Sequence, residues 1–223
     1  MESQLTDNDL AKMAYIIPNL PRYEVDVTKF WQWWDSVTIP IKRIQGDSAG
    51  NGKTGYDGEL WDGVTIWQKP EYQRNIVWKV NYHANEELFG EIIQRILKDL
   101  PWFDIHGITL WSNKKRIDPH MDGLPKDAFP SAPRIGLIDE CDIRTFYLIN
   151  RKVLSGLKYA VPNVTSGSNL FLFNNQNYLH GAMAASSGKK ILVRIDGPLI
   201  DPDGLKAYIN NQIAEGALYE GME

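Results

Sequence analysis

Cysteine is almost absent from this chain of 223 residues, because Cys141 is the only one. A single thiol excludes an intramolecular disulfide, and with only four histidines it also excludes a thiolate-rich zinc finger. This cysteine usage is typical of a reducing compartment, so we expect a cytoplasmic protein. The polar and acidic start of the chain supports that expectation, since no apolar stretch follows basic residues as in a secretion signal.

Long hydrophobic runs and an excess of positive charge are also lacking. No run approaches the length of a membrane span, so we expect no membrane association. The formal net charge is −4 and the pI is about 5.6, which disfavours a nucleic-acid partner held by bulk electrostatics. With 43% hydrophobic and 23% charged residues, the composition indicates a soluble globular protein.

Tryptophan is absent after Trp111, although the chain holds eight. The part of the chain before residue 105 reads as mixed structure. We expect a short helix over Lys29–Asp35, capped by Thr28. A second helix is expected over Glu86–Asp99, capped by Asn85, and the spacing of its apolar residues predicts one buried face. The predicted strands of this part are Val64–Trp67 and Ile76–Tyr82. The Gly-, Asp- and Asn-rich stretch Gly46–Gly58 predicts a loop.

From Ile105 onward, short β-rich runs alternate with turn residues. The predicted strands are Ile105–Trp111, Ile117–Asp122, Ile143–Asn150, Leu157–Val161, Asn169–Phe173, Tyr178–Ala182 and Ile191–Ile195. This spacing favours a β-sandwich or barrel, with a loop over Leu124–Pro133 and a surface helix over Pro202–Ala214. The expected fold is mainly β: an α+β N-terminal section (1–104), an antiparallel double-sheet core (105–197) and a helical tail (198–223), in one structural domain overall.

The stretch Ile117–Gly123 is the most informative part of the sequence. His120 and Asp122 are two residues apart on a predicted strand, so their side chains point to the same face. His180 follows on a second strand. Two histidines and one carboxylate on one face of an octahedron form the ligand set of non-haem iron(II) oxygenases. Asp118 lies on the same strand face as His120 and is the alternative carboxylate. The other two histidines are interpreted as structural.

A second feature is the pair of cations on the predicted strand that follows His180. Period-two alternation puts Lys190, Leu192 and Arg194 on one face of that strand. A cation on the inner face needs an anion, because an unpaired buried charge is very costly. Arg194 is the better fork for a carboxylate, and Lys190 offers a point charge. A salt bridge to Asp196 or an exposed face is the alternative interpretation.

These residues resemble the 2-oxoglutarate/iron(II)-dependent dioxygenases. The resemblance runs from about Ile105 to Asp196, and it consists of His120-x-Asp122, then His180, then a basic residue ten to fourteen positions later. Arg144-Thr-Phe-Tyr-Leu-Ile-Asn, followed by Gly167-x-x-Leu-Phe-Leu-Phe-Asn-Asn, is most similar to the aspartyl/asparaginyl and prolyl hydroxylase branches. The resemblance implies a double-stranded β-helix, a cupin-like jelly roll with the metal at one mouth of the barrel.

The resemblance also implies an activity. His120, Asp122 and His180 would bind Fe(II), and 2-oxoglutarate and dioxygen would be consumed with release of succinate and carbon dioxide. The distal carboxylate of 2-oxoglutarate would meet Arg194, which its geometry favours, or Lys190, with Arg144 as a further contact. The expected reaction is hydroxylation of a small-molecule or peptidyl substrate that the sequence does not name.

Two other functions stay open. The first is a cupin-like metalloenzyme that catalyses a non-oxidative isomerisation or hydrolysis with zinc, manganese or nickel, because ligand type alone does not fix the metal. The second is a binding module on the same β scaffold without turnover. Among the tryptophans, Trp111 is expected beside the metal-bearing strands, as a wall of the pocket.

Overall fold

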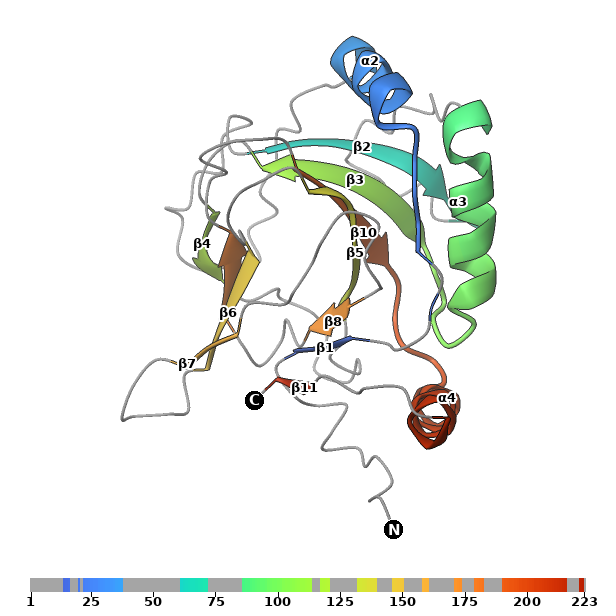
Figure 1. Cartoon of the computed structure of the whole chain (residues 1–223), viewed down its shortest axis with the longest axis vertical. Helices are drawn as coiled ribbons and strands as arrows, with labels where there is room; N and C mark the ends of the chain where they lie inside the picture. Colours follow the sequence, from blue (N-terminus) through green and yellow to red (C-terminus); the bar gives the residue numbers. More distant parts are fainter. Residues whose placement is uncertain are drawn as a thin grey trace.

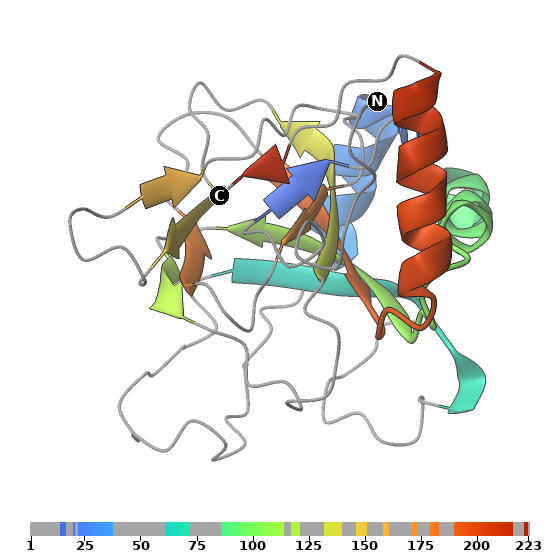
Figure 2. The ribbon, with the colours of Figure 1, turned by 90° about the horizontal axis from the view of Figure 1, so that it is seen from below.

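The chain folds as α+β, with two antiparallel sheets and three described helices (Figures 1 and 2). The computed structural model describes residues 14–16, 20, 22–37, 61–71, 86–113, 117–120, 132–139, 146–150, 158–160, 171–173, 179–182, 190–215 and 221–222. A seven-stranded sheet lies in the middle, the helices lie on one side of it, and a four-stranded sheet lies on the other.

Helix α2 spans Val27–Val37 and begins earlier than the sequence predicted. Its cap is Asp26 rather than Thr28, because an Asp26 carboxylate oxygen accepts the backbone N–H of Lys29 at 3.0 Å and satisfies one of the first free donors of the helix. The helix buries an aromatic face. Phe30 is fully buried and stacks on Trp34, with 5.7 Å between the ring centroids.

Helix α3 spans Glu86–Asp99, as predicted. Its buried residues are Phe89, Ile92 and Ile96, and Leu100 follows just beyond its end. They form one apolar cluster with the inward face of the large sheet. Leu97, which follows Ile96, is 36% exposed and lies at the margin of this face.

Helix α4 spans Pro202–Ala214, as predicted. The Asp201 side chain accepts the backbone N–H of Gly204 at 2.8 Å, and Pro202 occupies the first helical position, where no N–H is needed. Leu205 and Ile209 are fully buried, so a single apolar stripe attaches this helix to the core.

The seven-stranded sheet has the order β11-β1-β8-β5-β10-β3-β2. Its strands are β1 (Ala14–Ile16), β2 (Trp61–Gln68), β3 (Gly107–Asn113), β5 (Ala132–Asp139), β8 (Phe171–Phe173), β10 (Lys190–Asp196) and β11 (Gly221–Met222). Ile191, Val193 and Ile195 of β10 are all buried in the core cluster with α3. The alternate residues of β10 therefore face away from the helices.

The four-stranded sheet has the order β4-β9-β6-β7. Its strands are β4 (Ile117–His120), β6 (Phe146–Asn150), β7 (Lys158–Ala160) and β9 (Leu179–Ala182). The pairings of β4 with β9, of β9 with β6 and of β6 with β7 are all antiparallel, as the sequence predicted.

Three strands were absent from the sequence prediction. Strand β5 begins inside the predicted loop Leu124–Pro133. The loop was predicted because Pro133 is a typical turn residue, but β5 pairs with both β8 and β10. The short strands β1 and β11 pair with each other. The predicted loop Gly46–Gly58 and the predicted strand Ile76–Tyr82 lie outside the described residues.

Gly197, which follows β10, has a backbone that requires glycine. Its φ is +155°, and a Cβ atom there would collide with the backbone carbonyl of Asp104. Two backbone hydrogen bonds hold the chain at this crossing, from Asp104 N–H to the Pro198 carbonyl (3.0 Å) and from His106 N–H to the Asp196 carbonyl (2.6 Å). The end of β10 is thereby fixed against the start of β3.

A polar contact ties the segment before α2 to α3. Tyr23 is fully buried, and its hydroxyl donates to a carboxylate oxygen of Asp99 at 3.0 Å. Burial, reinforced by the negative charge of Asp99, raises the pKa of Tyr23 well above its usual value. The guanidinium of Arg95 lies over the Tyr23 ring, 5.1 Å from its centroid, and donates to the carbonyl of Arg22.

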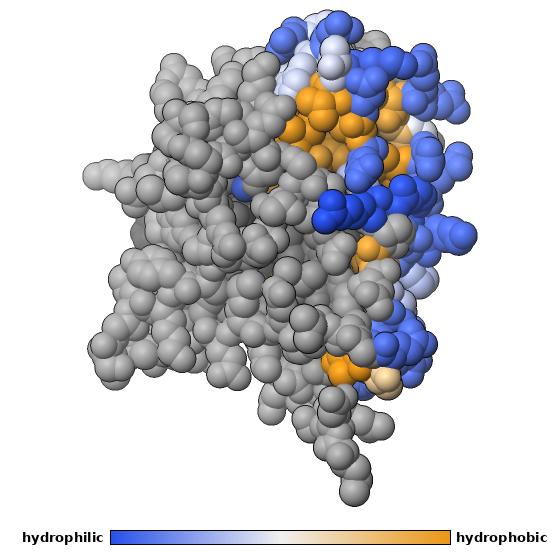
Figure 3. Space-filling view, in the orientation of Figure 1, coloured by the Kyte–Doolittle hydropathy of each residue, from blue (hydrophilic) through white to orange (hydrophobic). Residues whose placement is uncertain are grey.

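The described surface is hydrophilic along the outer sides of the helices, whereas apolar side chains gather where α2 and α3 meet (Figure 3). Val27 of α2 and Leu97 of α3 are the exposed large hydrophobic residues of these two helices. Among the described residues, none of the helices has the length and apolar character needed to cross a membrane.

Candidate functional site

His180 lies within the four-stranded sheet, on a strand that is paired on both sides. Across the pairing of β9 with β4 its Cα partner is His120, and across the pairing with β6 its partner is Leu148. Two of the predicted metal ligands, far apart in sequence, therefore occupy directly opposed positions on neighbouring strands.

An irregularity in β4 produces this alignment. Ile117 is opposite Ala182 and His120 is opposite His180, so β4 advances three residues where β9 advances two. The additional residue marks a β-bulge or a similar irregularity, and β4 is an edge strand of this sheet as described. Pro119 is compatible with an irregular pairing and with an edge strand, because it has no N–H to donate to a neighbouring strand. Regular pairing from Ile117 would have placed Pro119, rather than His120, opposite His180.

Of the three predicted metal ligands, His180 is the one whose side-chain surroundings the structure describes, and it is buried. Only 6% of its surface is exposed, and a buried imidazole requires polar partners. The side chains of His120 and Asp118, and all of Asp122 and Arg144, lie outside what the structure describes. Within the described part of the chain, no group of three His, Cys, Asp or Glu residues could hold a metal ion.

Arg194, on β10, is held by two neighbours. Its Nε donates to an Asp196 carboxylate oxygen at 2.6 Å, and its guanidinium lies over the Trp111 ring, 5.0 Å from the centroid. The ion pair with Asp196 is the alternative that the sequence left open. Stacking on an aromatic face is favourable for a guanidinium and restricts its orientation. Trp111, the predicted pocket wall, thus contacts one of the two predicted carboxylate-binding cations.

Lys190, the other predicted cation, lies at the opposite end of the same strand. It is 6% exposed, and its Cα partner on β5 is Asp139. The pairing of β10 with β5 shifts register between Ile191 and Leu192. Lys190 is therefore a buried ammonium group beside a local irregularity, in surroundings where charge interactions are stronger than at the surface.

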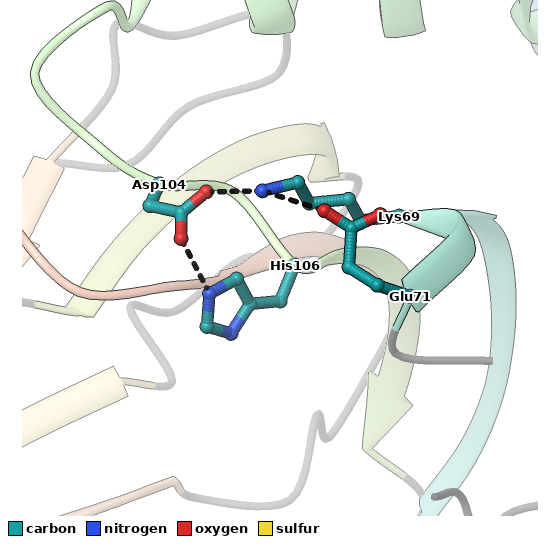
Figure 4. A network of polar contacts seen from close by, with 4 residues as sticks. All are labelled: Lys69, Glu71, Asp104 and His106. Atoms are coloured by element: carbon teal, nitrogen blue, oxygen red, sulfur yellow. Dashed lines mark hydrogen bonds and ion pairs between the residues drawn. The ribbon is translucent and has the colours of Figure 1, made fainter. Parts of the chain in front are cut away.

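A second polar cluster lies beside the start of β3 (Figure 4). It consists of Lys69, Glu71, Asp104 and His106. Lys69 Nζ is 2.9 Å from one Asp104 carboxylate oxygen and 3.0 Å from Glu71, and His106 Nε2 is 3.1 Å from the other Asp104 oxygen. Of these residues, the sequence had singled out only His106, which was interpreted as structural. The pairing of Lys69 with Asp104 joins segments distant in sequence and had no local signal.

The charges of this cluster reinforce one another. The hydrogen bond from Lys69, and then that from His106, lowers the pKa of Asp104 below its usual value. The hydrogen bonds to Asp104 and Glu71 raise the pKa of Lys69. The cluster joins the Arg194 region through Asp196, whose backbone carbonyl accepts the His106 N–H while its side chain binds Arg194.

No protein-family model matches this chain, and no curated protein matches it. Among solved structures, the chain is weakly similar to an oxidoreductase of the 2OG-Fe(II) oxygenase family from Burkholderia pseudomallei, with 14% sequence identity and a TM-score of 0.42. The similarity covers 63% of this chain and 72% of the other. A TM-score below 0.5 does not establish a common fold.

Proposed function

We propose that this protein is a mononuclear iron(II) oxygenase that uses 2-oxoglutarate, with His120, Asp122 and His180 as the metal ligands. The observation that supports the proposal is the opposition of His120 and His180 across β4 and β9. Directly opposed residues of antiparallel strands have Cα atoms about 4.5–5.5 Å apart, which suits two imidazoles that bind one ion. Asp122, two residues after His120, would complete the set.

The strand order supports a double-stranded β-helix as the fold of the core. Eight consecutive strands, β3 to β10, are divided equally, with β3, β5, β8 and β10 in the large sheet and β4, β6, β7 and β9 in the small one. Eight strands shared in this way between two facing antiparallel sheets are typical of jelly rolls. We propose the same division as from the sequence, with a core over 105–197 between an N-terminal section and a helical tail.

Lys190 is the better candidate for the distal carboxylate of 2-oxoglutarate, although the sequence favoured Arg194. Lys190 is buried, so its charge would interact strongly with a carboxylate. The Arg194 side chain is less buried, with 33% of its surface exposed, and it contacts Asp196 and the Trp111 ring. Arg144 stays a candidate for a further contact, proposed from the sequence resemblance alone.

The donor set fits Fe(II), since imidazole and carboxylate are its usual ligands in such sites. When bound, the metal and 2-oxoglutarate would supply the oxidative chemistry, with succinate and carbon dioxide as products beside a hydroxylated substrate. The chain itself would contribute the fixed spacing of His120 and His180, a buried and therefore water-poor surrounding for His180, and the cation of Lys190.

The direct test is anaerobic addition of Fe(II) and 2-oxoglutarate to the full-length protein. We expect a weak visible charge-transfer band, and we expect His180→Ala to abolish both the band and the bound iron. His106→Gln is the matched control, because it replaces a histidine outside the proposed ligand set and should keep the band. If wild type gives no band, or if the two variants behave alike, the proposal is wrong.

A second measurement tests the co-substrate position. Loss of a charge-assisted hydrogen bond costs about 1.5–3 kcal/mol, so Lys190→Met should weaken 2-oxoglutarate binding by roughly 10- to 150-fold. Arg194→Met should have a smaller effect. The opposite order would return the role to Arg194. Equal, small effects with a large loss of thermal stability in Lys190→Met would instead indicate an ion pair with Asp139.

A further inference from the structure

The pairing of β5 with β10 contains one additional residue on β5. Ile135 is the Cα partner of Val193, and Ile138 is the partner of Ile191, so β5 advances three residues where β10 advances two. All four residues are buried in the core cluster, on the side of the large sheet that packs against the helices. The two strands, which lie side by side in Figure 1, thus keep their apolar residues on one face across the register shift.

The register shift decides on which face of the sheet Asp139 is placed. With regular period-two alternation from Ile135, position 139 would fall on the helix side, within the apolar core. Because of the additional residue, Asp139 is instead the Cα partner of Lys190, on the face turned away from the helices. A shift of one residue therefore replaces an acidic position in the core by one directly opposite a buried lysine.

Lys190 requires an anion close by. It is the first residue of β10, yet only 6% of its surface is exposed. A buried ammonium group without an anion is very costly, and opposite charges directly across a strand pair stabilise a sheet. On the other side of β10 the described pairing with β3 starts only at Leu192. Among the described pairings, therefore, β5 is the strand that provides a Cα partner for Lys190, and that partner is acidic.

We infer that Asp139 is the counter-ion of Lys190 and thereby sets the affinity for the distal carboxylate of the co-substrate. This inference rests on the proposed function, because it deepens the role given there to Lys190. In the unliganded protein the Asp139 carboxylate balances the buried ammonium charge. An incoming carboxylate must share that ammonium with Asp139, and two anions repel each other strongly in surroundings of low polarity. Asp139 is a positioning residue that acts through Lys190 and weakens carboxylate binding.

Urea unfolding of the full-length protein tests the ion pair without metal or co-substrate. Lys190→Met and Asp139→Asn each leave one buried group without its partner, so each variant should unfold at a lower urea concentration than wild type. The double variant should lose less stability than the two single losses added together. The matched control combines Lys190→Met with Asp196→Asn, a carboxylate at the other end of the same strand, and there the losses should add.

Calorimetric titration with glutarate tests the effect on binding, because glutarate has both carboxylates of 2-oxoglutarate but no keto group. Asp139→Asn should bind glutarate about threefold or more tightly than wild type, since the ammonium is no longer shared with a second anion. Asp139→Glu keeps the charge and should stay near the wild-type affinity. Lys190→Met should abolish glutarate binding, with or without Asp139→Asn.

The two measurements distinguish the outcomes. If Asp139→Asn binds glutarate as wild type does, or more weakly, the inference is wrong, and additive unfolding losses would also overturn it. A purely structural ion pair would give non-additive losses without tighter binding. Failure of the proposed function differs from both, because wild type would then give neither glutarate binding nor the iron band. Should Asp139→Asn not fold alone, glutarate should restore its folding, since the ligand replaces the missing anion.

Discussion

His180 and His120 face each other across β9 and β4 only because β4 contains one residue more than its partner between Ile117 and His120. A bulge increases local twist and turns side chains out of the regular alternation, and bulges are frequent beside active sites. The same local irregularity therefore sets which residue of Asp118-Pro119-His120 is the Cα partner of the buried His180.

The carboxylate of the proposed metal site can be identified by two matched substitutions. Asp122→Asn should lower iron affinity by about 100-fold or more, since even loss of an outer-shell partner costs about 10- to 100-fold. Asp118→Asn changes the same chemical group on the same segment and should leave the affinity near that of wild type. Iron content after dialysis measures both. The reverse result would make Asp118 the ligand, as the sequence allowed.

Gly197→Ala should destabilise the fold by at least about 2 kcal/mol, because it combines an unfavourable positive φ with a collision against the Asp104 backbone. Gly107→Ala is the control. A Cβ at Gly107 would be 3.7 Å from the Trp67 carbonyl oxygen, which is an ordinary van der Waals contact. Urea unfolding compares the two variants, and equal losses would contradict the role given to Gly197.

Tyr23→Phe should lower the free energy of unfolding by about 1.5–3 kcal/mol near pH 7, because it removes the donor to the Asp99 carboxylate. The effect has a defined pH dependence. Since the folded-state pKa of Tyr23 is raised, its contribution is complete below the unfolded pKa of about 10 and is lost as the pH rises above it. Wild type should therefore lose stability above pH 10 more steeply than Tyr23→Phe. Parallel curves would contradict this.

Asp104→Asn should lower the melting temperature by roughly 1–3 °C at pH 7, a small effect because the pair with Lys69 is partly exposed. The pKa of Asp104 is lowered in the folded state, so its contribution is present above the unfolded value and is lost as the pH falls through the folded value. The difference between wild type and variant should thus shrink below about pH 4. A difference that grows on acidification would be evidence against the cluster.

The sequence predicted the helices better than the sheet. Helices α3 and α4 were predicted with their observed bounds, because local signals decide both: apolar spacing and acidic first-turn residues in α3, and the Asp201–Pro202 start of α4. Strand β5 was missed because its stability comes from two neighbouring strands, β8 and β10, that are distant in sequence. The low strand propensity of proline at Pro133 favoured a loop instead.

The candidate site was predictable only in part. The face-sharing rule for residues two apart selected His120 with Asp122, but it contained no information on the position of His180 across the sheet. The register shift between Ile117 and His120 was not predicted, although a proline within a strand pattern is one indication of a bulge.

The pairing of Ala14 with Met222 connects positions near opposite ends of the chain. Closing so large a loop carries an entropic cost that must be met before the contact contributes, so β1 and β11 are expected to join the sheet late in folding. They form one outer end of the described strand order, away from β10 and β3. In hydrogen-exchange experiments these two strands should therefore exchange first, while the amides of β10 and β3 stay protected longest.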